Sequence, residues 1–339
     1  MTQHAANLRV LAITRNAGSA SFEQRVLAYV DRLAERGIQV RWEVMPRSWF
    51  GRGAQRRRAR EFDLVWWHRY LLSPLSAWAW RRSARKIVYD FDDAIMYRSR
   101  GTGPKPDFLR NFKFTRWVGR CDAALPASEF LAKHARACCA NVTTIPMGVD
   151  LPAQADRPAG PDGPVELLWL GSRANFRYLA ELRPALEDLA RRRGGARLRV
   201  VGSQPLEVDG LHVDYRPWSP QEQDLALGQC HIGLCPIPDT PWTQGKCPYK
   251  VLQYMAHSMA WVGSPVGENL IAAGPAGPEA RGLCAAGHPQ WVEAMERLID
   301  DADLRRRMGQ AGRAYVQARH SRDAIADRLA ATFRQIVSG

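Results

Sequence analysis

The sequence contains no run of about twenty consecutive apolar residues, which is the length a membrane-spanning helix needs. A spanning helix is therefore excluded, although 46% of the 339 residues are hydrophobic. Residues 1–7 are polar and lack the apolar core of a signal peptide, which predicts a cytoplasmic protein. The seven cysteines form no Cys-x-x-Cys pair, so we expect reduced structural thiols rather than a zinc site or a disulfide framework.

Several motifs of common enzyme classes are also missing. The chain has neither the Walker sequence nor the Gly-x-Ser-x-Gly of hydrolases. No Gly-x-Gly-x-x-Gly follows an expected strand, which disfavours a dehydrogenase. His68 and His134 stand alone without partner spacing, so we expect neither to be a metal ligand or a catalytic group.

Positive charge is plentiful but confined to one half of the chain. Residues 1–150 contain 26 Lys and Arg against 13 Asp and Glu, whereas residues 151–339 contain 22 against 21. These cations are accompanied by Trp49, Phe50, Trp66, Trp67, Trp78 and Trp80. This composition favours contact with an anionic partner such as a membrane surface. The alternative is a solvated basic face above buried tryptophans.

The order of expected elements alternates between strand and helix twice. Strands are expected at 8–14, 38–44, 64–67, 86–90, 122–126 and 142–145, and a helix at 22–36 ends at Gly37. Residues 152–164 are rich in Pro, Ala, Gly and Asp and are expected to be a linker. The alternation then restarts with strands at 165–170, 198–201, 212–215, 232–236 and 261–264. Helices are expected at 178–193, 220–228, 248–259, 290–300, 302–319 and 322–337. The sequence therefore predicts an α/β protein with two parallel-sheet domains.

The segment from Lys246 to Ala256 carries the strongest functional pattern. A helix starting near Pro248 places Lys250 and Gln253 on the face opposite an apolar stripe, with Lys246 at its start. Cations at a helix N-terminus suit a diphosphate, because the free N–H groups and the helix dipole already attract anions. The alternative is an ordinary solvated helix face.

This segment resembles the signature helix of the family 4 glycosyltransferases (glycosyl transferases group 1), which have the GT-B fold. A frequent variant of that motif reads Gly-Lys-x-x-x-Lys-x-Leu-(Glu/Gln)-Tyr-Met-Ala. The resemblance implies two Rossmann-like domains facing a central cleft and a nucleotide-sugar donor. The fuller motif has two glutamates, and Gly245 and Gln253 stand in their places. Gln253 can still bind a ribose hydroxyl, whereas Gly245 has no side chain to offer.

The resemblance extends to other turns of the C-terminal half. Arg173, just after Gly171, is expected to share the donor diphosphate with Lys246 and Lys250. The segment around Arg216 resembles the loop that lies against the base. The alternative, that Trp218 braces the following helix, stays open. The turn after residues 261–264 contributes three further candidates: Gly267 for close approach to the donor, Asn269 for sugar hydroxyls or a helix cap, and Glu268 as a replacement for the missing glutamate.

Two features of the N-terminal half complete the expected site. Gly18 resembles the glycine loop that closes over the donor phosphates. Asp90, Asp92 and Asp93 form an Asp-x-Asp-Asp cluster at the end of the fourth strand, where Asp92 or Asp93 would act as base or orient the acceptor hydroxyl. The Asp-x-Asp spacing suits a divalent metal in the other main glycosyltransferase fold, but the resemblance implies a metal-independent enzyme without cofactor. The alternative is a structural network with arginines such as Arg98 and Arg100.

Taken with the resemblance, these features predict a retaining glycosyltransferase of cell-surface polysaccharide or glycoconjugate synthesis. Residues 1–150 would bind a glycan or lipid-linked acceptor and residues 165–320 the donor, with a linker at 151–164. Residues 321–339 would form a helix packing back on the first domain. We expect a cytoplasmic protein, peripheral to the inner face of the membrane, that does not bind nucleic acid. The alternatives are a non-catalytic sugar-nucleotide-binding relative and, from its charge, a nucleic-acid-binding protein.

Overall fold

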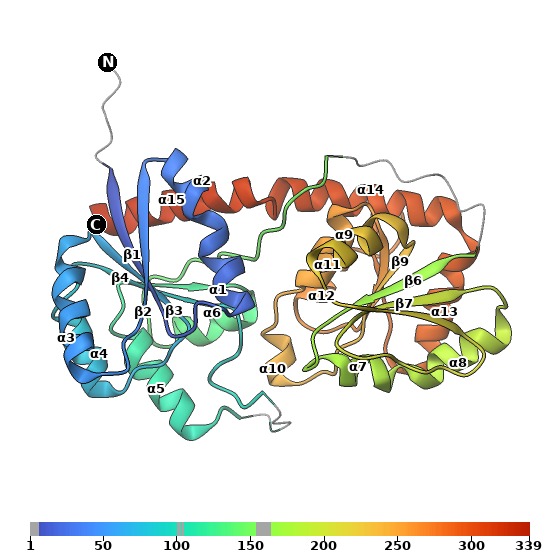
Figure 1. The fold of residues 1–339 in the computed structure, drawn as a ribbon, viewed down its shortest axis with the longest axis horizontal. Helices are drawn as coiled ribbons and strands as arrows, with labels where there is room; N and C mark the ends of the chain where they lie inside the picture. Colours follow the sequence, from blue (N-terminus) through green and yellow to red (C-terminus); the bar gives the residue numbers. More distant parts are fainter. Residues whose placement is uncertain (1–6, 100–102, 104, 154–163) are drawn as a thin grey trace, which may run out of the picture. The chain divides into compact units, whose positions relative to one another are not determined.

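The computed structural model describes residues 7–99, 103, 105–153 and 164–339, and the chain divides into two compact units (Figure 1). Unit 1 comprises Met1–Gly148, Thr240–Cys247 and Arg322–Gly339, and unit 2 comprises Val149–Asp239 and Pro248–Ser321. Most of the linker expected at 151–164, and most of the polar N-terminus, lie outside the described residues. Among the residues described, no helix combines the length and apolarity needed to cross a bilayer.

Unit 1 is built on a parallel five-stranded sheet with strand order β2-β1-β3-β4-β5. Four of its strands are short apolar runs, and three of these are buried along their whole length, whereas β2 alternates polar and apolar residues. The strands are β1 (Leu8–Thr14), β2 (Ile38–Val44), β3 (Leu64–His68), β4 (Ile87–Phe91) and β5 (Ala123–Pro126). The strand expected at 142–145 is reduced to a single bridge between Val142 and Ala124.

Helices cover both faces of this sheet. One face carries α3 (Trp49–Arg58), η2 (Ala59–Glu61), α4 (Pro74–Arg81), α5 (Phe108–Val118) and α6 (Glu129–Arg136). The other carries α1 (Ala20–Arg25), η1 (Leu27–Tyr29), α2 (Val30–Glu35) and the last helix, α15 (Arg322–Ser338). Ser48, Ser73, Asp107 and Ser128 each accept a backbone N–H at the start of their helix, which fixes where these helices begin.

Unit 2 contains a parallel six-stranded sheet with strand order β11-β10-β9-β6-β7-β8. The strands are β6 (Glu166–Leu170), β7 (Arg197–Gly202), β8 (His212–Pro217), β9 (Ile232–Cys235), β10 (Ala260–Gly263) and β11 (Leu283–Cys284). The helices are α7 (Phe176–Glu181), α8 (Arg183–Arg192), α9 (Pro220–Gln229), α11 (Tyr249–Ala256), α12 (Glu268–Ala273), α13 (Gly287–Asp300) and α14 (Ala302–Arg319). The short α10 (Pro241–Gln244) between β9 and α11 belongs to unit 1.

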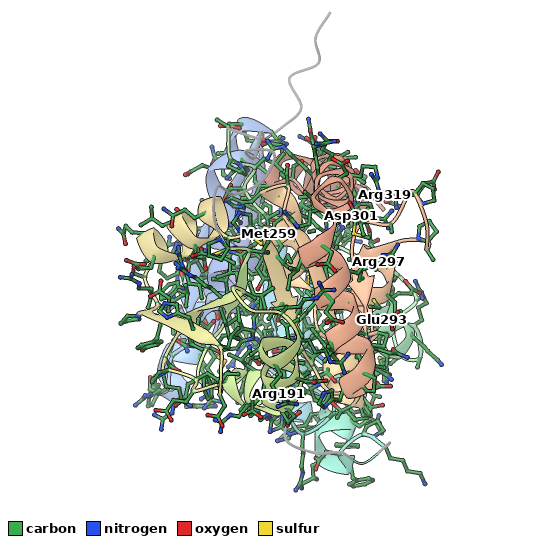
Figure 2. All side chains as sticks on the ribbon, turned by 90° about the vertical axis from the view of Figure 1, so that its right-hand side faces the viewer. Arg191, Met259, Glu293, Arg297, Asp301 and Arg319 are labelled. Carbon is green, nitrogen blue, oxygen red and sulfur yellow. The ribbon has the colours of Figure 1, made fainter. Side chains whose placement is uncertain are left out.

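The packing of unit 2 follows the amphipathic pattern of its helices. Trp291, Val292, Met295 and Leu298 on α13 enter the core, while Glu293 and Arg297 lie on its outer face (Figure 2). Tyr254 of α11 is fully buried, and its hydroxyl donates to the Leu234 carbonyl of β9 at 3.1 Å. Gly233 leaves room for that ring, because a Cβ there would lie 2.3 Å from it. Helix α11 is thereby held tightly against the sheet.

Two expected helices are interrupted in the structure. The helix expected at 22–36 changes direction at Val26, whose φ and ψ of −125° and −61° are not helical, and continues as η1 and α2. The helix expected at 178–193 splits into α7 and α8 around Leu182, two residues before Pro184. Proline lacks the N–H that an uninterrupted helix would use at that point, so the second helix starts afresh there.

Candidate functional site

In unit 2, Lys250 lies against the turn that follows β6. Its Nζ is 4.5 Å from the centre of the Trp169 ring, and a Cβ on Gly171 would lie 3.0 Å from that nitrogen and 2.3 Å from the indole. Only glycine therefore fits between the ring and the ammonium. The indole is completely buried, and its Nε1 has no hydrogen-bond partner among the described residues. The arrangement holds one cation at the carboxyl end of a central strand.

Three helices of unit 2 begin close to this edge without a side-chain cap. Helix α7 follows β6, α11 carries Lys250 in its first turn, and α12 follows β10. By contrast, Ser219 and Asp301 cap α9 and α14. Uncapped N–H groups, the helix dipole and a nearby ammonium are the usual components of a phosphate site. This part of unit 2 therefore suits an anionic ligand.

The other expected donor cations lie on exposed surface. Arg173 is in the turn between β6 and α7, and no carboxylate lies within ion-pair distance of it among the described residues. Arg216 stands on the edge strand β8 and is paired with Asp214 at 2.9 Å. Trp218 is 56% exposed, and its Nε1 donates to Gln223 on α9 at 3.1 Å. Trp218 thus has a bracing contact with the helix and still presents a free ring face.

The remaining expected donor residues differ in what they offer. Gln253 is half-buried on α11, one turn after Lys250. Gly267 takes a positive φ of 53° just before α12, and Glu268 is the first residue of that helix. Asn269 is 2% exposed, and its Nδ2 donates to the Ser264 carbonyl at 3.1 Å. The amide nitrogen of Asn269 therefore holds the loop after β10, and a contact of this residue with sugar hydroxyls stays a prediction.

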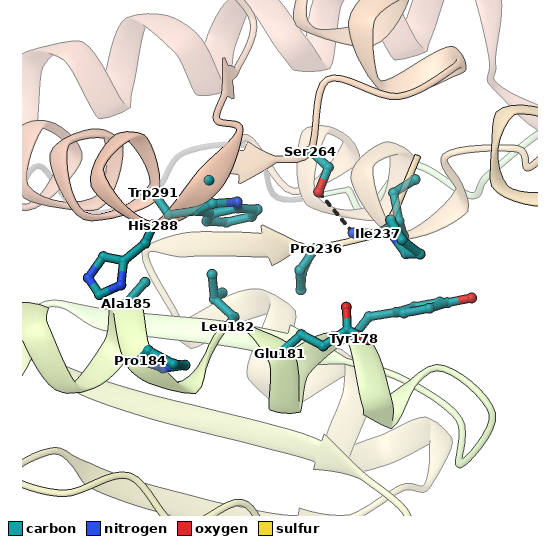
Figure 3. A pocket seen from close by; sticks show the side chains of 12 residues that line it. Tyr178, Glu181, Leu182, Pro184, Ala185, Pro236, Ile237, Ser264, His288 and Trp291 are labelled. Carbon is teal, nitrogen blue, oxygen red and sulfur yellow. Dashed lines mark hydrogen bonds between the residues drawn. The ribbon is translucent and has the colours of Figure 1, made fainter. Parts of the chain in front are cut away.

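A cavity of about 250 Å³ opens at the same edge of unit 2 (Figure 3). Tyr178, Leu182, Pro236 and Trp291 provide mainly apolar walls. The polar groups that line it belong to Tyr178, Glu181, Ser264 and His288, and no Lys or Arg is among the lining residues. None of the expected donor-binding residues lines it either. A cavity lined by a carboxylate and by no Lys or Arg does not suit a diphosphate, so we place the anion at Lys250 instead.

In unit 1, Asp92 and Asp93 share one arginine. Arg69 Nε lies 3.3 Å from Asp92 Oδ1, and its Nη2 donates to Asp93 Oδ2 at 2.5 Å. Arg69 follows β3 directly and has a φ of +56°, a left-handed conformation that is strained for a residue other than glycine. Such strain is characteristic of functional sites. Asp92 and Asp93 follow β4, the neighbour of β3, so the three residues meet at the carboxyl edge of the sheet.

The two carboxyl groups have opposite pKa shifts. Burial tends to raise the pKa of Asp92, but Arg69 and a hydrogen bond from Ser21 hold it below the ordinary value. Burial and the neighbouring Asp92 charge raise the pKa of Asp93, although Arg69 and Lys246 oppose the shift. A pair of carboxyl groups whose pKa values are driven apart is a common basis for acid–base roles. Asp93 is the better proton acceptor of the two, and Asp92 the permanent charge.

His68, which was not expected to take part in the site, completes this network. Its Nδ1 lies 3.2 Å from Thr14 Oγ1 and its Nε2 lies 2.9 Å from Ser21 Oγ. Burial lowers the pKa of His68 to about 3, so the ring is neutral. If Thr14 donates to Nδ1, then Nε2–H donates to Ser21 and frees the Ser21 proton for Asp92. His68 is thus a positioning residue. Its position directly after the strand expected at 64–67 was the one feature of the sequence that could have indicated a place in the site.

Asp90 has a structural role beneath this site. Arg25 donates to both of its carboxylate oxygens, at 2.8 and 3.0 Å, and Trp66 Nε1 donates at 3.1 Å. Asp90 therefore belongs to a structural network, as the alternative proposed, but its partner is Arg25. Of the two arginines expected there, Arg98 pairs with Asp107 and Arg100 lies outside the described residues. Because every carboxylate of the Asp-x-Asp-Asp cluster faces a guanidinium, the cluster does not suit a divalent metal.

Gly245 and Lys246 belong to unit 1, whereas Lys250 belongs to unit 2. A Cβ on Gly245 would be 2.8 Å from the Ala94 Cβ and 2.9 Å from Leu131 Cδ2, so no side chain fits there. This explains why the first glutamate of the signature motif is absent. Lys246 lies near enough to Asp93 to lower its pKa. The structure therefore unites Lys250 with Gly171 in unit 2, and Lys246 with Asp93 in unit 1.

Gly18 lies in the turn between β1 and α1, at the same edge of the unit 1 sheet as Asp92. Its N–H donates to Asn16 Oδ1 at 3.1 Å, and Ser19 caps the helix that follows. Gly18 is exposed, which leaves its backbone accessible. The structure gives no further indication of a ligand at this turn.

Comparison with known proteins identifies the C-terminal half. Residues 177–331 match the family model described as glycosyl transferase-like. This segment is similar to glycosyl transferases. No curated protein sequence matches the chain.

Similar solved structures share the fold over nearly the whole chain. A sucrose-phosphate synthase from Thermosynechococcus elongatus has a TM-score of 0.73 at 16% identity, covering 98% of this chain and 99% of that one. HepE from Anabaena, in complex with UDP-glucose, has a TM-score of 0.71 at 12% identity, covering 97% and 100%. A UDP-forming trehalose-phosphate synthase from Burkholderia xenovorans has a TM-score of 0.66 at 12% identity, covering 98% and 100%.

These findings confirm the expected fold: the α/β architecture with two parallel sheets is that of GT-B glycosyltransferases. The match of residues 177–331 to the glycosyl transferase-like family model agrees with the resemblance to group 1 glycosyltransferases. The individual site residues stay predictions that rest on the geometry above.

Proposed function

We propose that the protein transfers a sugar from a nucleotide-sugar donor to a glycan or lipid-linked acceptor in cell-surface polysaccharide or glycoconjugate synthesis. The observation that carries this proposal is the Lys250 ammonium, held over Trp169 beside the Gly171 turn. The uncapped starts of α7 and α11 lie at the same edge of the sheet. Together they provide the positive potential that a departing nucleoside diphosphate requires.

Within unit 2 the donor would be bound by several groups in series. Lys250 and the exposed Arg173 would neutralise the diphosphate, and Gln253 would bind the ribose. Trp218 and the strand end at Arg216 would receive the base, and Gly267 would allow the backbone before α12 to approach the sugar. The structural neighbour HepE, solved with UDP-glucose, supports a nucleotide sugar as donor but does not determine the base for this chain.

Within unit 1 the acceptor hydroxyl would meet Asp93. Its raised pKa favours proton uptake as the hydroxyl attacks, while ionised Asp92 keeps Arg69 in place. We propose transfer with retention of configuration and without a metal or other cofactor, in the cytoplasm at the inner face of the membrane. Gly18 would contribute its backbone to the donor phosphates.

A non-catalytic relative that only binds nucleotide sugars is the second candidate. It is favoured by the absence of any side chain at position 245 and by the buried amide of Asn269. The two candidates differ in turnover: both bind the donor, but only an enzyme releases nucleoside diphosphate from it.

The proposal is tested with a thermal-shift panel of UDP, GDP, dTDP and their sugars on the full-length protein. We expect one nucleotide family to raise the melting temperature, because a ligand that binds only the folded state stabilises it. Donor hydrolysis is then measured with the nucleotide sugar that binds. A panel without any shift contradicts the donor assignment, and binding without hydrolysis or transfer supports the non-catalytic candidate.

A further inference from the structure

Large apolar side chains are exposed at the starts of three neighbouring helices of unit 1. They are Trp49 and Phe50 on α3, Leu75 and Trp78 on α4, and Phe108, Leu109 and Phe112 on α5. Leu75, Phe50 and Phe108 are more than 80% exposed. Each residue lies within the first five positions of its helix. We call these seven residues and the cations between them the aromatic–arginine surface.

The topology places the seven residues along one edge of the unit 1 sheet. Helices α3, α4 and α5 follow β2, β3 and β4, which are parallel, and all three cover the same face of the sheet (Figure 1). Their first turns therefore lie toward the carboxyl ends of the strands. Asp92 and Asp93 lie at that same edge. The exposed apolar groups thus rim the region assigned to the acceptor.

The charge of this surface is of one sign. Helices α3, α4 and α5 contain eight Lys or Arg residues and no Asp or Glu. Arg82 lies over the Trp78 ring at 4.8 Å, and Arg116 over the Phe112 ring at 5.5 Å. The helices on the opposite face are mixed in charge, with acids such as Glu23, Asp31 and Asp323. The excess of positive charge therefore lies on the helices of this face, and Arg52, Arg110 and Lys113 are the cations nearest in sequence to the exposed apolar side chains.

We propose that the aromatic–arginine surface docks on an anionic phospholipid bilayer. Trp, Phe and Leu side chains insert at the boundary between headgroups and acyl chains, while Arg and Lys bind lipid phosphates. A nucleic acid would use the cations and the flat rings but gains little from exposed Leu75 and Leu109. The proposal deepens the proposed function, on which it rests, because a lipid-linked acceptor would then meet Asp93 at the membrane surface.

Vesicle flotation of the full-length protein tests the proposal. We compare phosphatidylcholine vesicles with vesicles containing equal amounts of phosphatidylcholine and phosphatidylglycerol, at low and high salt. We expect strong partition onto the anionic vesicles only, weakened by salt. The Trp49→Ser, Phe50→Ser, Phe108→Ser, Leu109→Ser variant should partition at least about tenfold less, and so should Arg110→Glu, Lys113→Glu.

A matched control separates this surface from exposed apolar residues in general. Leu225→Ser, Leu270→Ser changes two exposed leucines of unit 2 and should leave partition unchanged. The proposal is overturned if all variants partition equally onto the vesicles. It is also overturned if duplex DNA competes with vesicles for the protein and the variant with apolar substitutions still binds DNA. Melting temperatures confirm that each variant is folded. The nucleotide thermal shift is recorded on the same samples, so failure of membrane docking is distinguishable from failure of donor binding.

Discussion

The ammonium of Lys250 lies 4.5 Å from the centre of the Trp169 ring. Trp169 belongs to strand β6, and Gly171, the residue directly after this strand, has no room for a Cβ. Lysine is held in this position by a cation–π contact with a fully buried ring. Its charge is therefore positioned before any ligand arrives. Such preorganisation is what makes a positive group effective against a developing diphosphate.

Replacement of Asp93 should remove the proton acceptor of the reaction. We expect Asp93→Asn to lower turnover by about 10²- to 10⁴-fold, the usual contribution of a general base. Since the pKa of Asp93 is raised, the wild-type rate should fall as the pH drops through that pKa. The acid limb should disappear in Asp93→Asn. The pH profile of sugar transfer or donor hydrolysis measures both effects.

Asp92→Asn provides a second, distinct readout of the same pair. The Asp92 charge helps to raise the pKa of Asp93, so its removal should move the acid limb to lower pH. Asp63→Asn, at the amino end of β3 and paired with Arg85, is the control and should change neither rate nor profile. An unaltered profile in both site variants would contradict a coupled carboxyl pair.

The neutral state of His68 should make unit 1 sensitive to acid. Burial lowers the pKa of His68 to about 3, against 6.5 for the exposed side chain. Between these values the unfolded chain binds a proton that the folded protein does not. This group therefore removes stability as the pH falls below 6.5, by about 1.4 kcal/mol per pH unit.

His68→Asn tests this contribution because asparagine keeps hydrogen-bonding capacity but does not titrate. Its free energy of unfolding, measured by urea denaturation from pH 7 to pH 5, should decline less steeply than that of the wild type. Parallel slopes for the wild type and His68→Asn would show that His68 is not held neutral.

Restoring the missing glutamate should not restore the family motif. In Gly245→Glu the new Cβ would collide with Ala94 and Leu131, so we expect a loss of about 1–3 kcal/mol in unfolding free energy. Transfer activity should fall as well, because Ala94 adjoins Asp93. Gly228→Glu, where a side chain meets open space, is the matched control. A stable Gly245→Glu protein with raised activity would contradict this description of the site.

Much of the fold was predictable because buried parallel strands are short apolar runs. The helix at Ala302–Arg319 matches the expected range, and most strands agree within one or two residues. Helix α3 was not predicted, because its exposed Trp49 and Phe50 and its two glycines obscure the helical period. Helix α4 was missed for a similar reason, since Leu75 and Trp78 face outward.

Site residues were predictable only where their position along the chain, directly after a strand or at the start of a helix, was enough to select them. Asp92, Asp93, Gly171 and Lys250 were selected because they follow strands or start a helix. Pairings between distant residues, such as Arg69 with Asp93 or His68 with Ser21, depend on which strands are neighbours in the sheet. The assignment of Lys246 and Lys250 to different units could not be foreseen, because only four positions of sequence separate them.

The most direct test of the donor site is calorimetric titration with the nucleoside diphosphate that the thermal-shift panel selects. We expect the Lys250→Glu, Arg173→Glu variant to lose at least about 100-fold in affinity, because charge-assisted hydrogen bonds are replaced by repulsion. Lys133→Glu, at an exposed lysine of α6, should bind like the wild type. Undiminished affinity in a folded Lys250→Glu, Arg173→Glu protein would contradict the assignment of unit 2 as the donor-binding unit.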